Sequence, residues 1–332
     1  MIRVAINGFG RIGRQAAKIM LENDDVFKIV AVNDLTNPEA LANLLKYDSV
    51  YGLYEREVSS DADEIIIDKK KIKVYSEKDP ADLPWKEDKI DVVIESTGLF
   101  TKKEDAAKHI SAGAKNVVIS APSKGDDPAP TFLRGVNDDI LGDDKVINNA
   151  SCTTNCIAPT IQVLHDAFGV KKALMTTVHG YTADQNLQDG PHRDYRRARA
   201  AGLNIVPTST GAAIATTQVI PELKGVFDGT SLRVPVPVGS ISDITAVLKK
   251  EATVDQINST FEKAAKSKRY QGVLDVTREP LVSSDIIGNS ASAIVDLSLT
   301  QVVEDMVKVF AWYDNEFGYA NRLVEMVQQI GK

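Results

Sequence analysis

The chain has 332 residues, and at about 150 residues per domain this length predicts two domains. Lysine and arginine total 39 against 46 aspartates and glutamates, and the net charge of −7 disfavours a dedicated nucleic-acid-binding protein, because phosphate contacts need clustered cations. Two cysteines exclude a disulfide framework and fit a reducing cytosol, and no apolar run forms an N-terminal leader or approaches the roughly 18 residues of a membrane span. We therefore expect a soluble, cytoplasmic α/β protein.

The chain begins with a strand, a glycine-rich turn, a helix and a second strand. Residues 2–7 are apolar, and the turn Gly8–Gly13 follows them directly. Apolar residues then recur at helical spacing from Ile12 to Met20, and a second apolar run covers residues 27–32. This order is a βαβ unit, the beginning of a parallel sheet.

The rest of the first half continues the alternation of strands and helices. We expect a hairpin at residues 65–67 and 72–74, a helix at 103–112, and strands at 91–96, 116–120 and 146–148. The pattern predicts a Rossmann-type dinucleotide domain with a parallel sheet.

The second half has longer strands with fewer helices between them. We expect strands at residues 173–178, 230–236, 241–249 and 302–310, with helices at 212–219, 254–267 and 319–330. This grouping predicts an α+β domain with a mostly antiparallel sheet. The change of pattern places the domain boundary near residue 150.

The glycines of the first turn carry a nucleotide signal. Gly8, Gly10 and Gly13 form a G-x-G-x-x-G pattern that follows a strand and opens a helix, so that phosphates can approach the backbone closely. Asp34 lies about 20 residues further on, where its carboxylate would accept hydrogen bonds from a ribose 2′-hydroxyl and repel a 2′-phosphate. The plain alternative is a strand-ending aspartate that caps a turn. The combination favours NAD over NADP.

Cys152 is the candidate nucleophile. It lies between the strand 146–148 and an expected helix that Gly169 ends, and the N-terminus of a helix favours a thiolate. Cys156, one turn further along, is expected to be a small buried hydrophobe. We expect neither a metal site nor a disulfide, because no second Cys/His pair has ligand spacing and the two cysteines are four apart on one helix.

Four histidines could serve as the base. His109 and His165 fall within expected helices and His192 in a polar loop, whereas His179 ends a strand where it can face a cleft. An isolated histidine of this kind is more often structural, but its pairing with the cysteine favours a catalytic role. We expect His179 to act mainly as a proton acceptor in later steps, because a lowered thiol pKa also lowers nucleophilicity and so gains little.

Concentrated arginine indicates a phosphorylated substrate. Four arginines lie in the segment His192–Arg199, and Arg233 lies in an expected strand. Thr210 and Gly211 precede the helix 212–219, whose N-terminus could bind an anion. In an acidic protein such arginines suit small phosphate anions better than a polynucleotide. For three of the four loop arginines we expect a solvated or subunit-interface role.

These residues lie in motifs that together resemble the glyceraldehyde-3-phosphate dehydrogenase family. The motifs span essentially the whole chain in family order, and they are NGFGRIGR (Asn7–Arg14), ASCTTN (Ala150–Asn155), TVHGYT (Thr177–Thr182), RRARA (Arg196–Ala200), TGAA (Thr210–Ala213) and WYDNEFGY (Trp312–Tyr319). ASCTTN is highly specific for the family.

The resemblance implies a role for each candidate residue. Cys152 would be the nucleophile and His179 its base. NAD would be bound by Gly8, Gly10, Arg11, Ile12, Gly13, Asp34, Lys78 and Ser120, with Asn315 holding the nicotinamide carboxamide. The inorganic-phosphate side would be lined by Ser151, Thr153, Thr210 and Gly211, and substrate phosphates would be bound by Thr182, Arg197 and Arg233.

The resemblance also implies a reaction and an assembly. Glyceraldehyde 3-phosphate would be oxidised by NAD and phosphorylated to 1,3-bisphosphoglycerate in glycolysis, through a thiohemiacetal and a thioester on Cys152. The protein would be a cytoplasmic homotetramer. Residues 1–150 together with a final helix at about 316–332 would form the NAD-binding domain, and residues 151–315 the catalytic domain.

The sequence departs from the family pattern in one loop. Ala183 stands where many bacterial members have Asn, and Gln188–Pro191 differs from their usual Leu-Asp-Leu-Pro. In the family this loop approaches a neighbouring subunit's cofactor, so the preference for NAD over NADP depends mainly on Asp34.

Three alternative functions stay open at this stage. Erythrose-4-phosphate dehydrogenase is the nearest. A cysteine protease would leave the glycine pattern without a purpose. A non-enzymatic RNA- or protein-binding role is disfavoured by the acidic composition.

Overall fold

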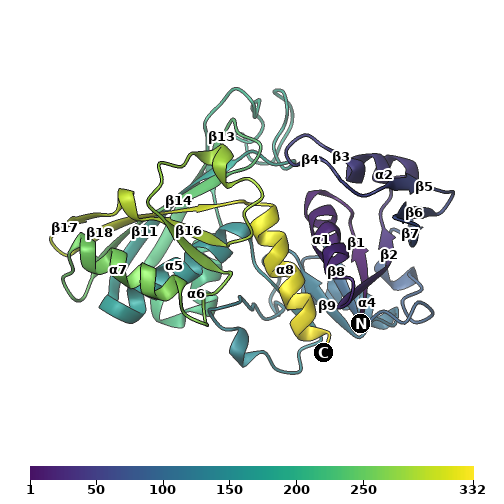
Figure 1. The fold of residues 1–332 in the computed structure, drawn as a ribbon, viewed down its shortest axis with the longest axis horizontal. Coiled ribbons are helices and arrows are strands. Elements are labelled where there is room, and N and C mark those ends of the chain that lie inside the picture. Colours follow the sequence, from purple (N-terminus) through teal and green to yellow (C-terminus); the bar gives the residue numbers. More distant parts are fainter. The chain divides into compact units, whose positions relative to one another are not determined.

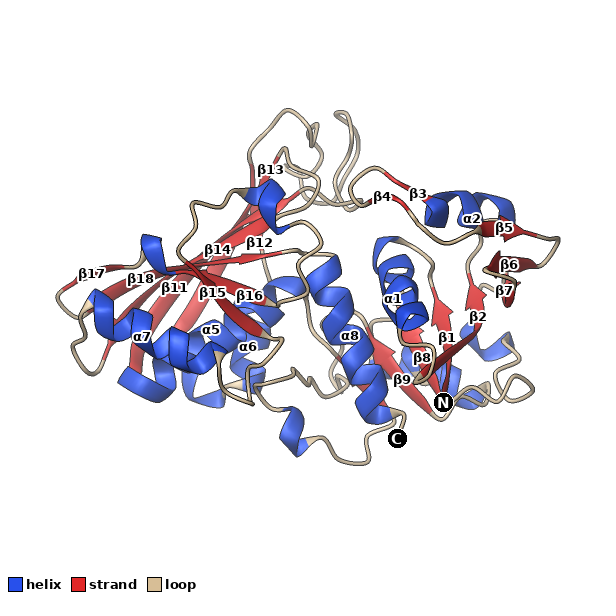
Figure 2. Cartoon of the chain, viewed as in Figure 1, coloured by secondary structure: helices blue, strands red, loops and turns tan.

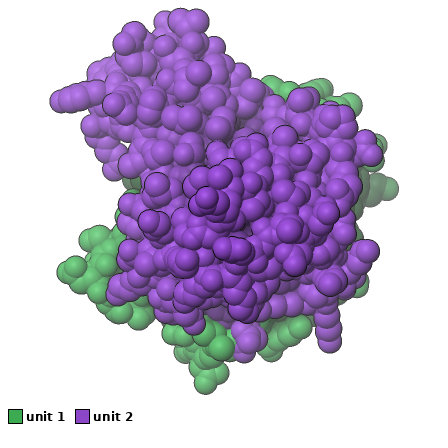
Figure 3. All heavy atoms as spheres, turned by 90° about the vertical axis from the view of Figure 1, so that its left-hand side faces the viewer, with its two compact units in different colours: residues 1–132, 140–150, 320–332 green, residues 133–139, 151–319 purple.

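The computed structural model describes residues 1–332, and the chain divides into two compact units (Figures 1 and 3). Unit 1 comprises residues 1–132, 140–150 and 320–332, and unit 2 comprises residues 133–139 and 151–319. The short segment 133–139 lies with unit 2 because Arg269 donates hydrogen bonds to the carbonyls of Gly135 (2.7 Å) and Val136 (3.2 Å).

Unit 1 contains an eight-stranded sheet in the order β10-β9-β8-β1-β2-β7-β6-β5. The strands are β1 (Ile2–Asn7), β2 (Phe27–Asn33), β5 (Val58–Ser60), β6 (Glu64–Ile67), β7 (Lys70–Tyr75), β8 (Val92–Glu95), β9 (Asn116–Ile119) and β10 (Val146–Asn148). Six neighbouring strands, from β10 to β7, pair in parallel, and the two antiparallel pairs are β7–β6 and β6–β5. The expected Rossmann-type sheet is confirmed, and the order reverses between β1 and β8, where such sheets bind dinucleotides.

The helices of unit 1 flank this sheet. They are α1 (Arg11–Glu22), α2 (Pro38–Lys46), α3 (Lys103–Ala106), α4 (Lys108–Ser111) and most of α8 (Phe317–Ile330), with a small β3–β4 ribbon (Tyr47–Asp48, Gly52–Leu53) after α2. The single helix expected over 103–112 is wrong, because the chain breaks it at Ala107 into two short helices. The end of α8 is tied to the sheet by Asn116, whose side chain donates to the carbonyl of Ile330 (3.1 Å).

Burial on both faces of the sheet explains why the strands in the first half of the sequence are short apolar runs. All four residues of β8 are buried, as are Val117, Val118 and Ile119 of β9, because a parallel sheet is covered on both faces. Trp85 is the largest buried side chain of the core beside them.

Unit 2 contains a second eight-stranded sheet in the order β12-β13-β11-β14-β18-β16-β15, with β17 paired to β18. The strands are β11 (Val170–Gly180), β12 (Val206–Ser209), β13 (Phe227–Val234), β14 (Ser240–Leu248), β15 (Leu274–Thr277), β16 (Ala293–Asp296), β17 (Gln301–Val303) and β18 (Met306–Tyr313). Only β11–β13 and β15–β16 are parallel, so the expected mostly antiparallel sheet is confirmed.

One expected strand of unit 2 is wrong. Residues 302–310 form the hairpin β17–β18, because Glu304 adopts a positive φ of 54° and reverses the chain. The apolar residues on both sides of the turn gave the appearance of one continuous strand.

Three helices cover one face of this sheet (Figure 2). They are α5 (Cys152–Phe168), α6 (Ala212–Val219) and α7 (Val254–Ala265). The alternating burial of β14 shows that its other face is only partly covered. None of the helices of the structure combines the length and the apolarity that crossing a membrane requires.

Candidate active site

The glycine-rich turn of unit 1 has the shape that a phosphate-binding loop needs. Gly8 adopts a φ of +91°, and a Cβ there would lie 2.7 Å from the backbone nitrogen of Thr97. A Cβ at Gly13 would lie 2.3 Å from the carbonyl oxygen of Gly8. A Cβ at Gly10, in contrast, would meet nothing within 4 Å. Two glycines are therefore required by the fold, and the third leaves open space beside the start of α1.

This open space fits a dinucleotide pyrophosphate. Gly10 is the N-cap of α1 and provides no side-chain cap, and the N–H groups of a helix's first turn have no acceptor within the helix. The guanidinium of Arg11 pairs with Asp48 (2.8 Å) and lies over the ring of Tyr51. Arg11 and Ile12 would thus contribute through their backbone rather than their side chains.

The other candidate NAD residues of unit 1 lie at the same edge of the sheet. Asp34 follows β2, and its two carboxylate oxygens accept hydrogen bonds from the backbone nitrogens of Phe9 (2.9 Å) and Thr36 (3.0 Å). Lys78 is exposed in the loop after β7, and Ser120 directly follows β9. Since β1, β2, β7 and β9 are parallel, these residues come together at the carboxyl edge.

In unit 2, the structure brings Cys152 and His179 together. Cys152 is the first residue of α5, and its Sγ lies 3.4 Å from Nε2 of His179, near the end of β11. Ser151 is the N-cap of α5, and its hydroxyl accepts a hydrogen bond from the backbone nitrogen of Thr154 (3.1 Å). Residues 27 apart in the sequence therefore form a thiol–imidazole pair.

The hydrogen bonds around His179 assign its tautomer. Nδ1 lies 2.7 Å from the carbonyl oxygen of Gly180, to which an N–H at this position donates. Nε2 is then left with its lone pair toward the sulfur of Cys152. Arg233 lies alongside and donates to the carbonyl of Gly180 (3.2 Å) and to Oγ1 of Thr182 (3.3 Å).

Burial dominates the electrostatics of this pair. Burial, helped by the positive charge of Arg233, lowers the pKa of His179 to about 3. Burial also raises the pKa of the Cys152 thiol, and Arg233 offsets part of that rise. Burial therefore opposes the thiolate that the helix N-terminus favours, and it favours a neutral imidazole facing a thiol in the free protein.

Tyr313 joins the two sides of the pair and was not singled out from the sequence. Its buried hydroxyl lies 2.9 Å from Oγ1 of Thr153 and 2.8 Å from Oγ1 of Thr177. Its ring meets that of His179 edge-on, with the centroids 6.0 Å apart. Burial raises the pKa of Tyr313 far above its usual range, so it stays a neutral phenol.

Arg197 and Arg233 are the two candidate cations for binding phosphate. Arg197 donates to Oγ1 of Thr208 (2.9 Å) and the carbonyl of Ser209 (3.2 Å), and it pairs with Asp184. Arg233 is largely buried, and its Nε has no hydrogen-bond partner. Each arginine therefore keeps a positive charge beside the active site.

Two further candidates, Thr210 and Gly211, lie at the start of α6. Gly211 is the N-cap of α6, and Oγ1 of Thr210 accepts from the backbone nitrogen of Ala212 (3.2 Å). The other arginines of the loop, Arg193, Arg196 and Arg199, are exposed.

Asn315 is buried after β18 and is held by its side-chain oxygen. Oδ1 accepts hydrogen bonds from the backbone nitrogen of Gly239 (3.1 Å) and from the hydroxyl of Ser240 (2.9 Å). The two N–H groups of its amide are thereby directed away from these partners, where they could donate to a ligand.

Comparison with known sequences matches both units. Residues 2–103 match the family model "Glyceraldehyde 3-phosphate dehydrogenase, NAD binding domain", and residues 151–315 match "Glyceraldehyde 3-phosphate dehydrogenase, C-terminal domain". The chain belongs to the glyceraldehyde-3-phosphate dehydrogenase family. It is thus an oxidoreductase with NAD as its cofactor, which confirms the prediction from the glycine pattern.

Full-length relatives support the same family assignment. The chain is 53% identical to glyceraldehyde-3-phosphate dehydrogenase 2 of Streptomyces avermitilis over 99% of this chain and 98% of the relative. It is 52% identical to glyceraldehyde-3-phosphate dehydrogenase of Borreliella burgdorferi over the whole of both chains. It is also 52% identical to that of Mycobacterium leprae, over 100% of this chain and 99% of the relative.

Sequence reasoning missed several residues around this dehydrogenase site. Tyr313 lies inside the motif WYDNEFGY and so had a signal, but its hydroxyl network could not be foreseen. Asp184 and Asp194, which pair with Arg197, carry no motif of their own. Their role follows only from the folded positions of the two loops.

Proposed function

We propose that this chain catalyses the oxidative phosphorylation of D-glyceraldehyde 3-phosphate to 1,3-bisphosphoglycerate with NAD, as a step of glycolysis. The observation that carries the proposal is the 3.4 Å contact between the sulfur of Cys152 and Nε2 of His179, beside the buried charge of Arg233. Nucleophile, base and phosphate-binding cation are the three groups that this reaction requires.

In the first step, Cys152 adds to the aldehyde. His179 takes the thiol proton on Nε2 as the carbon–sulfur bond forms, and it returns that proton to the aldehyde oxygen, which gives a neutral thiohemiacetal. The hydrogen bond from Nδ1 to Gly180 keeps the imidazole oriented while Nε2 gives and takes the proton. The low pKa of His179 keeps Nε2 unprotonated at neutral pH, although it also makes the imidazole a weaker base.

In the second step, the thiohemiacetal is oxidised and then cleaved by phosphate. NAD, when bound, supplies the hydride acceptor for this oxidation. His179 takes the hydroxyl proton, so that the carbonyl re-forms as a thioester on Cys152. An oxygen of inorganic phosphate attacks this carbonyl, the carbon–sulfur bond breaks, and the released acyl phosphate leaves the thiolate to be reprotonated.

The proposal assigns the other candidate residues to binding. Substrate phosphates are bound by Thr182, Arg197 and Arg233, and the inorganic-phosphate side is lined by Ser151, Thr153, Thr210 and Gly211. NAD is bound by Gly8, Gly10, Arg11, Ile12, Gly13, Asp34, Lys78, Ser120 and Asn315. Residues 1–150 with 316–332 act as the NAD-binding domain and residues 151–315 as the catalytic domain.

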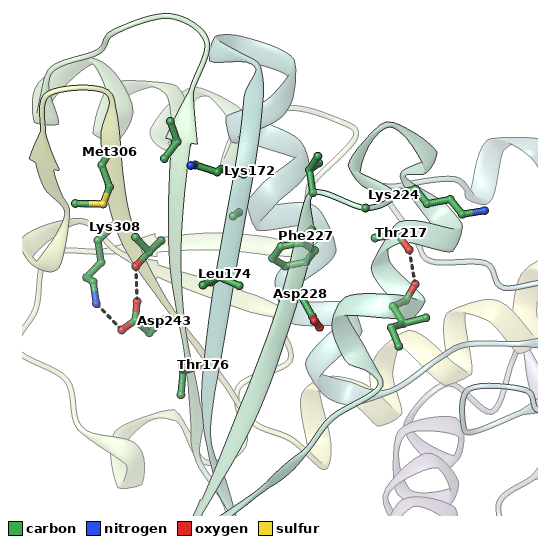
Figure 4. A pocket seen from close by; sticks show the side chains of 16 residues that line it. Lys172, Leu174, Thr176, Thr217, Lys224, Phe227, Asp228, Asp243, Met306 and Lys308 are labelled. Carbon is green, nitrogen blue, oxygen red and sulfur yellow. Dashed lines mark hydrogen bonds and ion pairs between the residues drawn. The ribbon is translucent and has the colours of Figure 1, made fainter.

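We also propose that the protein is a cytoplasmic homotetramer. The uncovered face of the unit 2 sheet supports this, because it carries a pocket of about 970 Å³ and apolar side chains such as Leu174, which is 67% exposed (Figure 4). Monomeric proteins rarely leave large apolar patches open to water. Light scattering tests the assembly, and a monomeric mass at micromolar concentration contradicts it.

The decisive assay follows NADH absorbance with glyceraldehyde 3-phosphate or erythrose 4-phosphate, each with and without inorganic phosphate. We expect rapid NADH formation only with the triose and phosphate together. A rate that does not depend on phosphate contradicts the phosphorylating reaction, and a preference for the tetrose contradicts the substrate.

A further inference from the structure

A chain of buried side chains crosses the carboxyl edge of the unit 1 sheet. Trp85 donates from its indole nitrogen to Nδ1 of His109 (2.9 Å), and Nε2 of His109 lies 3.0 Å from a carboxylate oxygen of Glu95 at the end of β8. His109 is 0% and Glu95 2% exposed. This carboxylate is therefore removed from water, without a lysine or arginine within ion-pair distance.

The chain continues from Glu95 across β1 and β2. Nδ2 of Asn7, at the end of β1, donates to the same oxygen of Glu95 (2.5 Å), and Nδ2 of Asn33, at the end of β2, donates to Oδ1 of Asn7 (2.7 Å). Asn33 then exchanges two hydrogen bonds with the backbone of Glu77, which lies after β7 (2.8 and 2.9 Å). The other oxygen of Glu95 accepts from the backbone nitrogen (2.9 Å) and hydroxyl (2.5 Å) of Thr97.

The direction of these hydrogen bonds is fixed by chemistry. An indole N–H can only donate, so Nδ1 of His109 must accept, and its proton is then on Nε2 and is donated to Glu95. Asn7 and Thr97 also donate to this carboxylate. Glu95 is thus the common acceptor of four donors, and no group that itself donates could replace it.

Three residues of this chain directly precede residues that we assign to NAD. Asn7 precedes Gly8, Asn33 precedes Asp34, and Glu77 precedes Lys78. Thr97 sets the position of the glycine turn, because its backbone nitrogen leaves no room for a Cβ on Gly8.

We propose that Glu95 is a positioning residue of the NAD site, which holds four loops in register through these hydrogen bonds. The inference rests on the NAD binding described under Proposed function. All of these hydrogen bonds lie within unit 1, whereas Cys152 and His179 belong to unit 2, so we expect the effect on cofactor affinity rather than on the chemical step.

The test is Glu95→Gln, which keeps the size of the side chain but places an NH₂ donor opposite donors. The full-length variant is compared with the parent by calorimetric titration with NAD. Leaving one buried donor unpaired typically corresponds to a tenfold change or more, and we expect the Kd for NAD and the KM for NAD to rise about tenfold. The kcat at saturating NAD stays within about threefold of the parent, and hydrogen exchange quickens at the amides of Thr97 and Glu77.

Asp296 provides a matched control in unit 2. It is also buried, and it also accepts from an indole, that of Trp312 (3.2 Å), and from the backbone nitrogen (3.1 Å) and hydroxyl (2.6 Å) of a residue two positions on, Ser298. Asp296→Asn therefore disturbs an equivalent buried carboxylate away from the loops of unit 1. We expect its Kd for NAD to stay within about twofold of the parent.

A rescue variant tests the direction of the hydrogen bonds. Asn7→Asp alone places two carboxylates side by side and should weaken NAD binding. In the double variant, Asn7→Asp with Glu95→Gln, the carboxylate and the amide exchange positions, so that the acceptor stands at residue 7. The introduced glutamine amide can then donate to the new carboxylate, which still accepts from Asn33. We expect the double variant to bind NAD at least threefold more tightly than Glu95→Gln. If Glu95→Gln does not fold, we expect the double variant to fold and to bind NAD.

Three results would overturn the inference. The first is a Kd for Glu95→Gln within twofold of the parent, and the second is an equal loss of affinity in Asp296→Asn. The third is a folded double variant that binds NAD no better than Glu95→Gln. If Glu95→Gln does not fold, the third result is a folded double variant that does not bind NAD. Failure of the parent itself to bind NAD would instead contradict the proposed function on which the inference rests.

Discussion

The two units offer different groups to the negatively charged ligands that we propose for them. The glycine turn of unit 1 offers backbone N–H groups and open space beside Gly10, and the carboxylate of Asp34 accepts a hydrogen bond from the backbone of the turn. Unit 2 places the guanidinium groups of Arg197 and Arg233 around the thiol of Cys152 and the buried imidazole of His179. Backbone groups bind without a large change in the charge of the site, whereas buried side chains also shift the pKa values of their neighbours.

The unit 2 site is therefore the more strained electrostatically. Arg233 is charged and largely buried with its Nε unpaired, and His179 is held neutral by the same burial. A partly buried cation with an unpaired N–H and no carboxylate bonded to it is unfavourable, and a bound phosphate would compensate it. The comparison predicts that side-chain changes have large effects on rate in unit 2, while backbone changes govern cofactor affinity in unit 1.

The largest effect is expected for Cys152→Ser. An alkoxide is far harder to form than a thiolate, so we expect the rate of NADH formation to fall by about 10⁴-fold or more. Cys156→Ser is the control, because that sulfur is buried and lies 3.7 Å from the carbonyl of Ala311. Its variant should keep a rate within about tenfold of the parent, and an equal loss in both would remove the special role of Cys152.

His179→Asn should reduce kcat by about 10²–10⁴-fold, the usual contribution of a general base. The asparagine keeps a polar group beside Gly180 but has no basic nitrogen for the thiol and hydroxyl protons. Steady-state kinetics at saturating substrate measure the loss. A kcat within threefold of the parent would remove His179 from the base role.

The same variant should change how stability depends on pH. The pKa of His179 is about 3 in the folded protein and 6.5 for an ordinary histidine, so only the unfolded chain binds this proton between those values. The contribution of His179 to stability is complete above pH 6.5 and is lost as the pH falls toward 3. Urea titrations at pH 7 and pH 4.5 should show a smaller acid loss in His179→Asn, and an equal loss would contradict the low pKa.

Within unit 1, two glycine variants separate folding from binding. Gly13→Ala puts a methyl 2.3 Å from the carbonyl oxygen of Gly8 and should lower the free energy of unfolding by about 2 kcal/mol. Gly10→Ala adds a methyl in open space and should leave stability within about 0.5 kcal/mol, while the Kd for NAD rises about tenfold. Denaturant titration and calorimetry measure the two effects, and a reversal of this order would contradict the assignment of Gly10.

The same contrast explains what could be predicted from the sequence. The glycine turn is contiguous and its conformation is local, so strand, turn, helix and Asp34 were all recognised. Cys152 and His179 were identified by their places at the ends of elements, but the 3.4 Å contact needed the folded sheet. The neutral state of this pair was not foreseen, because burial is a property of the surrounding fold rather than of the motif.

The network around Glu95 marks the limit of sequence reasoning. Its members lie in five separate segments and match no common motif, and Asn7, Asn33 and Glu95 appear individually as the polar ends of apolar strands. Only the parallel order of β8, β1 and β2 brings them together. Predicting them would have required the register of the sheet.

The smallest effect is expected for Asp34→Asn, which tests cofactor choice by the acidic side chain that is bonded to the backbone of the glycine turn. The asparagine keeps an oxygen for the backbone nitrogen of Phe9, so the glycine turn stays tied to β2. The negative charge that would repel a 2′-phosphate is lost, and we expect the ratio of kcat/KM for NAD over NADP to fall about tenfold. Because repulsion between partly exposed charges is screened by salt, the parent's discrimination should also weaken between about 0.05 and 0.5 M salt, whereas that of the variant should not. A salt-independent preference in the parent would show that Asp34 selects NAD by hydrogen bonding to the ribose rather than by charge.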